Sequence, residues 1–260
     1  MIQGKSMSFL VNHPVLFFVV GVVVLWLSAH LGALVRHRLH PDQLDDDDDY
    51  SLVLGATLTL LALLIGFTFS MAAGRYDQRK NFEEEEANAI GTEFVRADLL
   101  PPADAAKVRE LLREYLDLRI VYYSHLTHEQ LQQNDAATAQ LQARLWAAIT
   151  PAVNADPNPV RAIVAEGMND VLNRQGYTQA AWLNRVPIAA WLLMMAIAVF
   201  SNILFGYRAK GKKSRLMFLY LPVALSISFF LVSDIDSPRG GVIVVAPQNL
   251  EILADSLRAH

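Results

Sequence analysis

The sequence predicts an all-α integral membrane protein with four transmembrane helices and a soluble helical insert between the second and the third of them. Apolar residues make up 53% of the 260 residues, and many of them are gathered in four long runs without a charged residue. The sequence between the second and third runs has helical periodicity and no clear strand pattern. No helix-terminating signal follows directly after the second run, so the second membrane helix is expected to continue beyond the bilayer into water.

The four apolar runs are the candidate membrane spans. Each is close to the roughly 20 helical residues that cross a hydrocarbon core of ~30 Å, and a helix satisfies its backbone hydrogen bonds in lipid within its own segment. A buried core helix would explain one such run, but four in one chain indicate a membrane protein. The first run exceeds the ~7–15 apolar residues of a secretory signal, so we expect a retained helix. The runs cover residues 14–35, 52–73, 186–205 and 216–232.

These runs divide the chain into an N-terminal transmembrane pair, a helical insert, a C-terminal transmembrane pair and a tail, at residues 1–73, 74–185, 186–232 and 233–260. Between Arg75 and Leu100 there is no proline. The second membrane helix is therefore predicted to continue to Pro101 and Pro102, which end it. From Ser51 this makes about 50 residues, or ~75 Å at 1.5 Å per residue.

Capping signals predict where the helices of the insert begin and end. One helix is expected to start near Ala103. Thr127 and Gln130 have the spacing of a capping box, and the helix that they begin is expected to end at Pro151, because a proline breaks the hydrogen bonds of a helix interior.

A last helix of the insert is predicted to begin at Pro159, with Asn158 as its N-cap. This helix should lead into the third membrane span. Gly176 and Pro187 are the candidate break points along it, since glycine and proline are the residues least favoured in a helix interior.

Composition and motifs exclude several functional classes. The formal net charge of −4 argues against a nucleic-acid partner. The absence of cysteine excludes disulfides, thiolate metal sites and cysteine nucleophiles. Glycine-rich phosphate loops, serine–histidine–acid sets and HExxH zinc helices are also missing from the sequence. We therefore predict that the protein is not an enzyme, with no catalytic residue and no cofactor.

Two polar groups could hold a metal ion, but we expect no metal site. The five aspartates of Asp45–Asp49 lack the spacing and the glycine of an EF-hand, which favours a solvated acidic loop. His125 and His128 stand on either side of the helix start that is predicted at Thr127, so they are not expected to share a helix face.

Small and hydroxyl residues form a stripe along the second predicted span. Their steps of three and four residues place them on one helix face. Such a face can be a packing seam, where helices approach closely in lipid, or the wall of a pore, where small side chains leave room. In a pore, Phe67 or Phe69 could form a gate that opens and closes by wetting. The stripe consists of Gly55, Thr59, Ala62, Gly66, Ser70 and Gly74.

Charged residues follow this stripe on the predicted helix extension. Pairs at i and i+4, such as Arg79 with Glu83, are typical of a solvated helix surface and contribute about 0.3–0.5 kcal/mol each. Alternatively, copies of the helix in a ring would place such charges around a vestibule, where they would select ions by sign. The candidate vestibule charges are Arg75, Arg79, Glu83 and Glu86.

Several motifs in the second span, its extension and the tail resemble one known family. They are GFTFSMA at 66–72, RYDQR at 75–79, EEANAIGT at 85–92, RADLLP at 96–101 and DSPRG at 236–240. Together with the plan of two spans, a helical insert and two spans, they are similar to the bestrophin-like family of bacterial membrane proteins. Bestrophins carry related Gly-Phe and Tyr-Asp-Arg patterns along a pore-lining second helix.

The resemblance implies a homo-oligomer, pentameric in bestrophins, that conducts inorganic ions along the second helix. It also implies a multi-pass protein of the bacterial inner membrane, surrounded by lipid, with the insert and both termini in the cytosol. Charge alone leaves the orientation open, because seven positive residues flank the spans on each side, although those in the short loops are denser. The alternative function is a non-conducting scaffold or sensor, anchored in the membrane, whose insert binds a protein partner.

Overall fold

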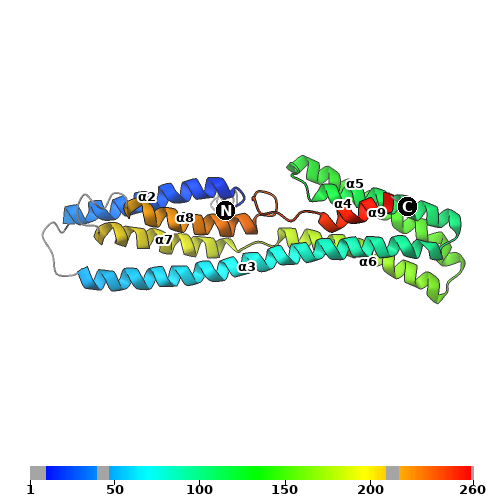
Figure 1. Cartoon of the computed structure of the whole chain (residues 1–260), viewed down its shortest axis with the longest axis horizontal. Coiled ribbons are helices and arrows are strands. Elements are labelled where there is room, and N and C mark those ends of the chain that lie inside the picture. The colour runs from blue at the N-terminus through cyan, green and yellow to red at the C-terminus, as the bar shows by residue number, and fades with distance from the viewer. Residues whose placement is uncertain (1–9, 40–46, 209–216, 259–260) are drawn as a thin grey trace. The chain divides into compact units, whose positions relative to one another are not determined.

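Helices make up nearly all of the chain that the structure describes. The computed structural model describes residues 10–39, 47–208 and 217–258, and these residues contain no strand (Figure 1). Four helices carry stretches that are long and apolar enough to cross a membrane. The predicted all-α fold is therefore confirmed. The elements are α2 (Pro14–Leu39), α3 (Asp47–Arg96), η1 (Ala97–Leu99), α4 (Pro102–Tyr122), α5 (His128–Ala155), α6 (Pro159–Leu183), α7 (Ile188–Arg208), α8 (Met217–Asp236) and α9 (Gln248–Arg258).

Helix α3 is one continuous helix of 50 residues, as the missing stop signal predicts (Figure 1). It ends at Arg96, and the 3-10 helix η1 leads from there to Pro101. Pro102 opens α4, with Pro101 as its N-cap, because proline has no N–H to satisfy and is tolerated in a first helical turn.

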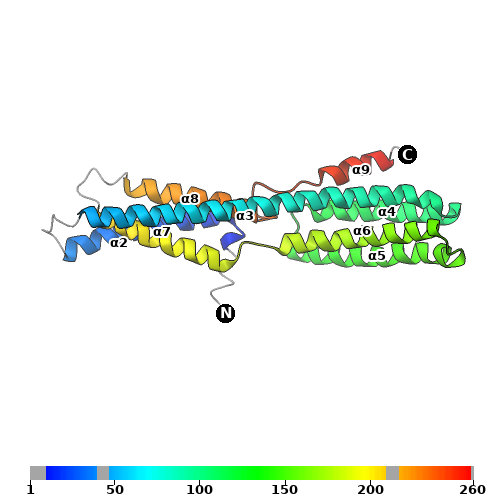
Figure 2. The same ribbon diagram turned by 90° about the horizontal axis from the view of Figure 1, so that it is seen from below.

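The chain falls into two compact units. Unit 1 comprises residues 1–76 and 185–244, and unit 2 comprises residues 77–184 and 245–260. Unit 1 therefore contains α2, α7, α8 and the first part of α3. Unit 2 contains the rest of α3 with η1, α4, α5, α6 and α9, and Figure 2 shows α4, α5 and α6 side by side within it.

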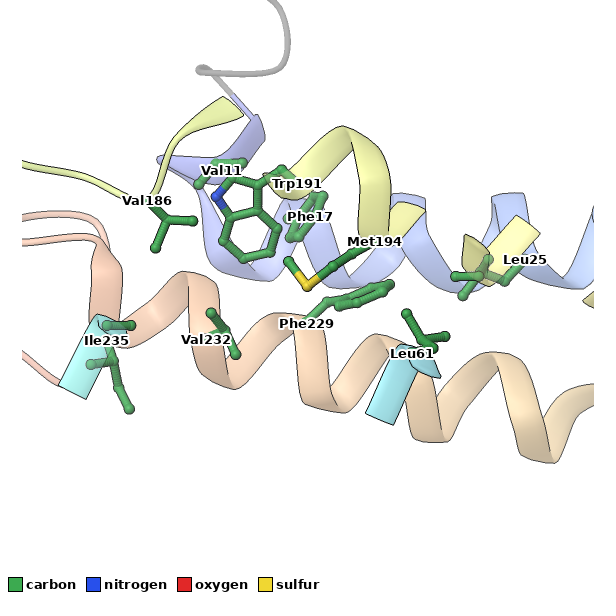
Figure 3. Close-up of a cluster of buried hydrophobic side chains, with 12 residues drawn as sticks. Val11, Phe17, Leu25, Leu61, Val186, Trp191, Met194, Phe229, Val232 and Ile235 are labelled. Atoms are coloured by element: carbon green, nitrogen blue, oxygen red, sulfur yellow. The ribbon is translucent and has the colours of Figure 1, made fainter. Parts of the chain in front are cut away.

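The core of unit 1 is built on aromatic side chains from three helices (Figure 3). Phe17 of α2 lies edge-on to Trp191 of α7, with ring centroids 5.3 Å apart. Its centroid is 6.4 Å from that of Phe229 on α8. Leu61 and Ala72 of α3 are fully buried in the same cluster, so α3 contributes one side of its apolar run to this core.

Two glycines let α2 and α7 pack closely. A Cβ on Gly206 would lie 1.8 Å from the carbonyl oxygen of Ala29, and a Cβ on Gly32 would lie 1.9 Å from that of Ile203. No side chain fits at these distances, because backbone atoms cannot move aside as a flexible side chain can. Small residues at the contact are the usual way in which helices approach each other in lipid.

The caps of unit 2 agree with the sequence. The side chain of Thr127 accepts a hydrogen bond from the N–H of Gln130, and the side chain of Gln130 accepts one from the N–H of Thr127, at 3.2 and 2.9 Å. The side chain of Asn158 accepts from the N–H of Arg161 at 2.9 Å. The predicted starts of α5 and α6 are therefore confirmed.

Two expectations for helix ends were wrong. Helix α5 continues through Pro151 to Ala155. It ends there because Pro157 and Pro159 follow, and a residue before a proline disfavours the helical conformation. Helix α6 passes Gly176 without a break, and the chain leaves the helix only at residues 184–187. The second candidate break, at Pro187, is therefore the one that occurs.

Replacement of Gly206 should strain the contact between α2 and α7. We expect Gly206→Ala to lower the melting temperature of the detergent-solubilised protein, since overpacking a tight core costs about 1–3 kcal/mol. Gly55→Ala is the matched control, because nothing lies within 4 Å of a Cβ at that position. Thermal unfolding followed by far-UV circular dichroism makes the comparison, and equal melting temperatures for the two variants would contradict the close helix contact.

Candidate functional site

One side of α3 is buried along almost the whole helix. Buried residues recur at steps of three, four or seven, which keeps them on one face. In unit 1 they are apolar or weakly polar, and in unit 2 charged residues join them. They include Leu54, Leu61, Thr68 and Ala72 in unit 1, and Arg79, Glu83, Glu86 and Ile90 in unit 2.

The predicted small-residue stripe lies on the opposite, exposed side of α3. Gly55, Thr59, Ala62, Gly66, Ser70 and Gly74 are all exposed. No heavy atom of the described residues lies within 4 Å of a Cβ at any of the three glycines. Of the most apolar stretch of α3, 17% is buried, compared with 28–44% in the other three candidate spans. Most of this apolar stretch of α3 is thus left uncovered by the described chain.

Within the part of the chain that the structure describes, the stripe is therefore not a packing seam. The helix contact that relies on small residues is made by Gly32 and Gly206 instead. What remains for the stripe is contact with another chain, with lipid or with water. Phe67 and Phe69, with 62% and 39% of their surface exposed, flank the stripe on its two sides by helical spacing.

Three of the four predicted vestibule charges are buried. Arg79, Glu83 and Glu86 have at most 1% of their surface exposed. Steps of seven residues lead from the buried Ala72 to Arg79 and Glu86, which places these charges on the side of α3 that faces the other helices of unit 2. They therefore form neither a vestibule wall nor the solvated surface that was the alternative. The charges that face solvent in the same stretch are Asp77, Lys80 and Glu84.

Glu86 is held inside unit 2 by a buried ion pair. Its carboxylate contacts the guanidinium of Arg119 on α4, with both side chains fully buried, and accepts from the hydroxyl of Thr178 on α6 at 3.1 Å. Burial, and then the charge of Glu86, raises the pKa of the Tyr115 phenol. Such a pair costs stability when one partner is removed, because the other charge stays buried and uncompensated.

Glu83 fixes the C-terminal helix to α3. Its carboxylate accepts hydrogen bonds from the backbone N–H groups of Asn249 and Leu250, at 2.8 and 3.0 Å, and from the amide side chain of Asn249 at 2.7 Å. These groups belong to the first turn of α9, where N–H groups lack partners within the helix. Glu83 thus acts as an N-cap supplied by a distant segment.

Arg75, the fourth predicted charge, belongs to a junction made by the tail motif in unit 1. Its guanidinium lies 3.8 Å from the carboxylate of Asp236, whose own side chain is fully buried. Asp236 also accepts from the N–H of Val186, at 3.1 and 3.2 Å. Nearby, Ser233 donates to the carbonyl of Val11 at 2.9 Å. The end of α8 is thereby connected to α3, to the segment before α7 and to the start of the described chain.

The potential metal groups fall partly outside the described structure. The side chains of Asp45–Asp49 lie outside it. Among the residues that are described, no three His, Asp or Glu side chains are grouped so that they could hold a metal ion.

A family model for the bestrophin-like domain matches residues 21–250, which is most of the chain. The chain belongs to the bestrophin-like family. The matched region of this bestrophin-like chain includes all of α3, so the resemblance of the motifs in that helix is confirmed. A comparison with functionally curated proteins gave no match.

Solved structures show the same fold. The crystal structure of a bacterial bestrophin homologue from Klebsiella pneumoniae has 16% sequence identity to this bestrophin-like chain and a TM-score of 0.62, over 94% of this chain and 95% of that one. A single-site variant of the Klebsiella pneumoniae homologue has 15% identity and a TM-score of 0.65, over 93% and 94% of the two chains. At such low identity the likeness establishes the fold.

Sequence reasoning missed two features of this bestrophin-like chain. It left α9 as an undivided tail, although Leu250, Ala254 and Leu257 recur at helical spacing and are buried. It also read the charges of α3 as solvent-facing. The one available signal was their spacing, because Arg79 and Glu86 follow Ala72 in steps of seven residues.

Loss of the Glu83 cap should release α9. We expect Glu83→Ala to increase amide hydrogen exchange across residues 248–258, since removing an N-cap costs about 0.5–2 kcal/mol. Glu84→Ala, an exposed neighbour on the same helix, should leave this exchange unchanged. Hydrogen–deuterium exchange with mass spectrometry distinguishes the two, and unchanged protection of α9 in Glu83→Ala would show that the cap does not hold it.

Proposed function

We propose that copies of this chain assemble into a homo-oligomer in which the exposed small-residue face of α3 surrounds a pathway for inorganic ions. The observation that carries this proposal is the exposure of α3. Its apolar stretch is only 17% buried, and three glycines on the face have open space beside them. A helix whose apolar side chains the rest of the chain leaves exposed is suited to contacts with other copies and to lining an axis.

The two exposed sides of α3 differ in a way that suits this arrangement. Val53, Leu60 and Met71 share one side and are large and apolar, as lipid-facing or subunit-facing positions require. The stripe beside them is small and includes the hydroxyls of Thr59 and Ser70. The Thr59 hydroxyl donates to the carbonyl of Gly55 at 2.8 Å, and its oxygen can still accept a hydrogen bond. Small side chains with such oxygens leave room for hydrated ions.

A constriction would come from the aromatic residues that flank the stripe. Phe67 and Phe69 are exposed, and a ring of either side chain would form an apolar narrowing that gates by dewetting. Beyond the membrane part, Asp77 and Glu84 continue the spacing of the stripe, with Lys80 between them. In a ring of copies these three charges would act on ions at the mouth of the path.

The proposed location is the bacterial inner membrane, with lipid around α2, α7, α8 and the apolar side of α3. We propose that the insert and both termini lie in the cytosol and that the ring has five copies, as bestrophins do; the family resemblance supports this proposal. The length and apolar character of the four candidate spans support the membrane location.

Gly66→Leu should change ion flux. The protein is purified in mild detergent, its native mass is determined, and flux is measured in liposomes. We expect a ring of several copies that passes ions. We also expect Gly66→Leu to reduce the flux at least about tenfold, because a leucine fills the open space beside the glycine. Gly176→Leu is the control, since that helical glycine also has open space around it but lies on α6, outside the four apolar runs of the sequence.

A monomeric mass, or equal flux in both variants, would contradict an axial pathway along α3. Either result would favour the other function that the sequence allows, a non-conducting scaffold or sensor whose insert binds a protein partner.

A further inference from the structure

Glu93 is an acid of α3 that lies completely buried in unit 2. None of its surface is exposed, and neither of its carboxylate oxygens has a hydrogen-bond partner among the residues that the structure describes. The buried acids Glu83 and Glu86 differ in this respect, because both bind partners on other helices. Glu93 is thus buried without the compensating contacts that these two acids have.

A buried acid without a partner is far more stable as the neutral carboxyl group than as the ionised carboxylate. Such a group keeps its proton to a higher pH than a solvated one, because desolvation penalises the charged form. Burial raises the pKa of Glu93 from its ordinary value of 4.5 to about 8, against the opposing effect of Arg96. At neutral pH Glu93 is therefore mostly protonated in the folded protein, whereas a glutamate in water is ionised.

Gly167 of α6 packs directly against this carboxyl group. A Cβ at position 167 would lie 2.1 Å from Oε2 of Glu93 and 2.4 Å from a terminal nitrogen of Arg96. The two side chains of α3 therefore fill the space that a side chain of α6 would need, and the backbone of α6 closes over the carboxyl group. Helix α6 has to move away from α3 at this point before water can reach Glu93.

Arg96 is the charged residue that acts on Glu93. It lowers the pKa of Glu93, but its effect is smaller than that of burial. All the other acids around Glu93 except Glu166 already pair with an arginine other than Arg96. The charged groups on the helices around Glu93 are Glu85, Glu86 and Arg96 on α3, Asp98 on η1, Arg109 and Arg113 on α4, and Glu166, Asp170 and Arg174 on α6.

We propose that Glu93 and Gly167 form a proton-dependent latch between α3 and α6, which is firm while the carboxyl group keeps its proton and loosens as the pH rises. Opening of the contact lets water solvate the carboxyl group, which then releases its proton to the solvent. The latch belongs to the insert and lies beyond the second apolar run at residues 52–73. The proposal holds whether or not the chain conducts ions.

The stability of this contact depends on pH with a definite sign. Below pH 4.5 Glu93 is protonated whether the contact is closed or open, so the latch is at its firmest. Between 4.5 and about 8 only the closed contact keeps the proton, and each unit rise in pH therefore favours opening by about tenfold. Above about 8 Glu93 is ionised in both states, so a further rise in pH has no additional effect through this group.

Hydrogen–deuterium exchange of the full chain in detergent measures the opening. The readout is the protection of the α6 amides around Gly167, corrected for the change of the intrinsic exchange rate with pH. We expect the wild-type protection to fall at least about tenfold between pH 6 and pH 7.5 relative to Glu93→Gln, because the amide of that variant does not titrate. Glu84→Gln removes an exposed acid of the same helix and is the matched control, which should follow the wild type.

Infrared spectroscopy of the wild-type protein detects the proton itself and does not depend on the folding of a variant. We expect the C=O band of a protonated carboxyl group at pH 7, which disappears as the pH rises through about 8. The proposal is overturned if this band is missing at pH 7. It is also overturned if the protection of α6 in Glu93→Gln changes with pH as it does in the wild type, or if Glu84→Gln abolishes the pH dependence.

Discussion

Helix α3 has to keep one side buried over 50 residues while its surroundings change from apolar to polar. The protein meets this constraint by holding the spacing of the buried residues constant and changing their chemistry. Leu61 and Ala72 pack in the apolar core of unit 1, whereas Glu83 and Glu86 occupy the equivalent side in unit 2. There they bind α9 and α4 through hydrogen bonds and an ion pair. Because one side is committed in this way, the opposite side of α3 is left exposed along its length.

The glycines of the chain serve two different purposes. Gly32 and Gly206 are in a tight contact between α2 and α7, where any side chain would meet a backbone oxygen. Gly55, Gly66 and Gly74 have open space instead. A glycine in a helix costs roughly 0.5–1 kcal/mol relative to alanine, so three of them without an internal contact need another explanation. The proposed oligomer offers one, because small side chains on every copy leave room for ions along the axis.

Local signals in the sequence predicted much of this fold. Uninterrupted apolar runs predicted the spans, and the Thr127 and Asn158 caps predicted two helix starts, since these features act within a few residues. The burial of Glu83 and Glu86 could not be predicted in the same way. Their partners, Asn249 and Arg119, are far away along the chain, and charged residues are rarely buried without such partners. The stripe lies on one face of α3, but the sequence alone does not say whether other helices cover that face or leave it exposed.

The account depends most on whether the stripe of α3 faces water in the assembled protein. The chain has no cysteine, so single cysteines can be placed at Thr59, Ala62, Gly66 and Ser70, and for comparison at Val53, Leu60 and Met71. The decisive measurement is the rate at which each reacts with a charged, water-soluble thiol reagent in liposomes. The account predicts fast reaction along the stripe and slow reaction at the three comparison positions. Uniformly slow reaction would contradict it, because a stripe covered by lipid or by a neighbouring helix excludes such a reagent.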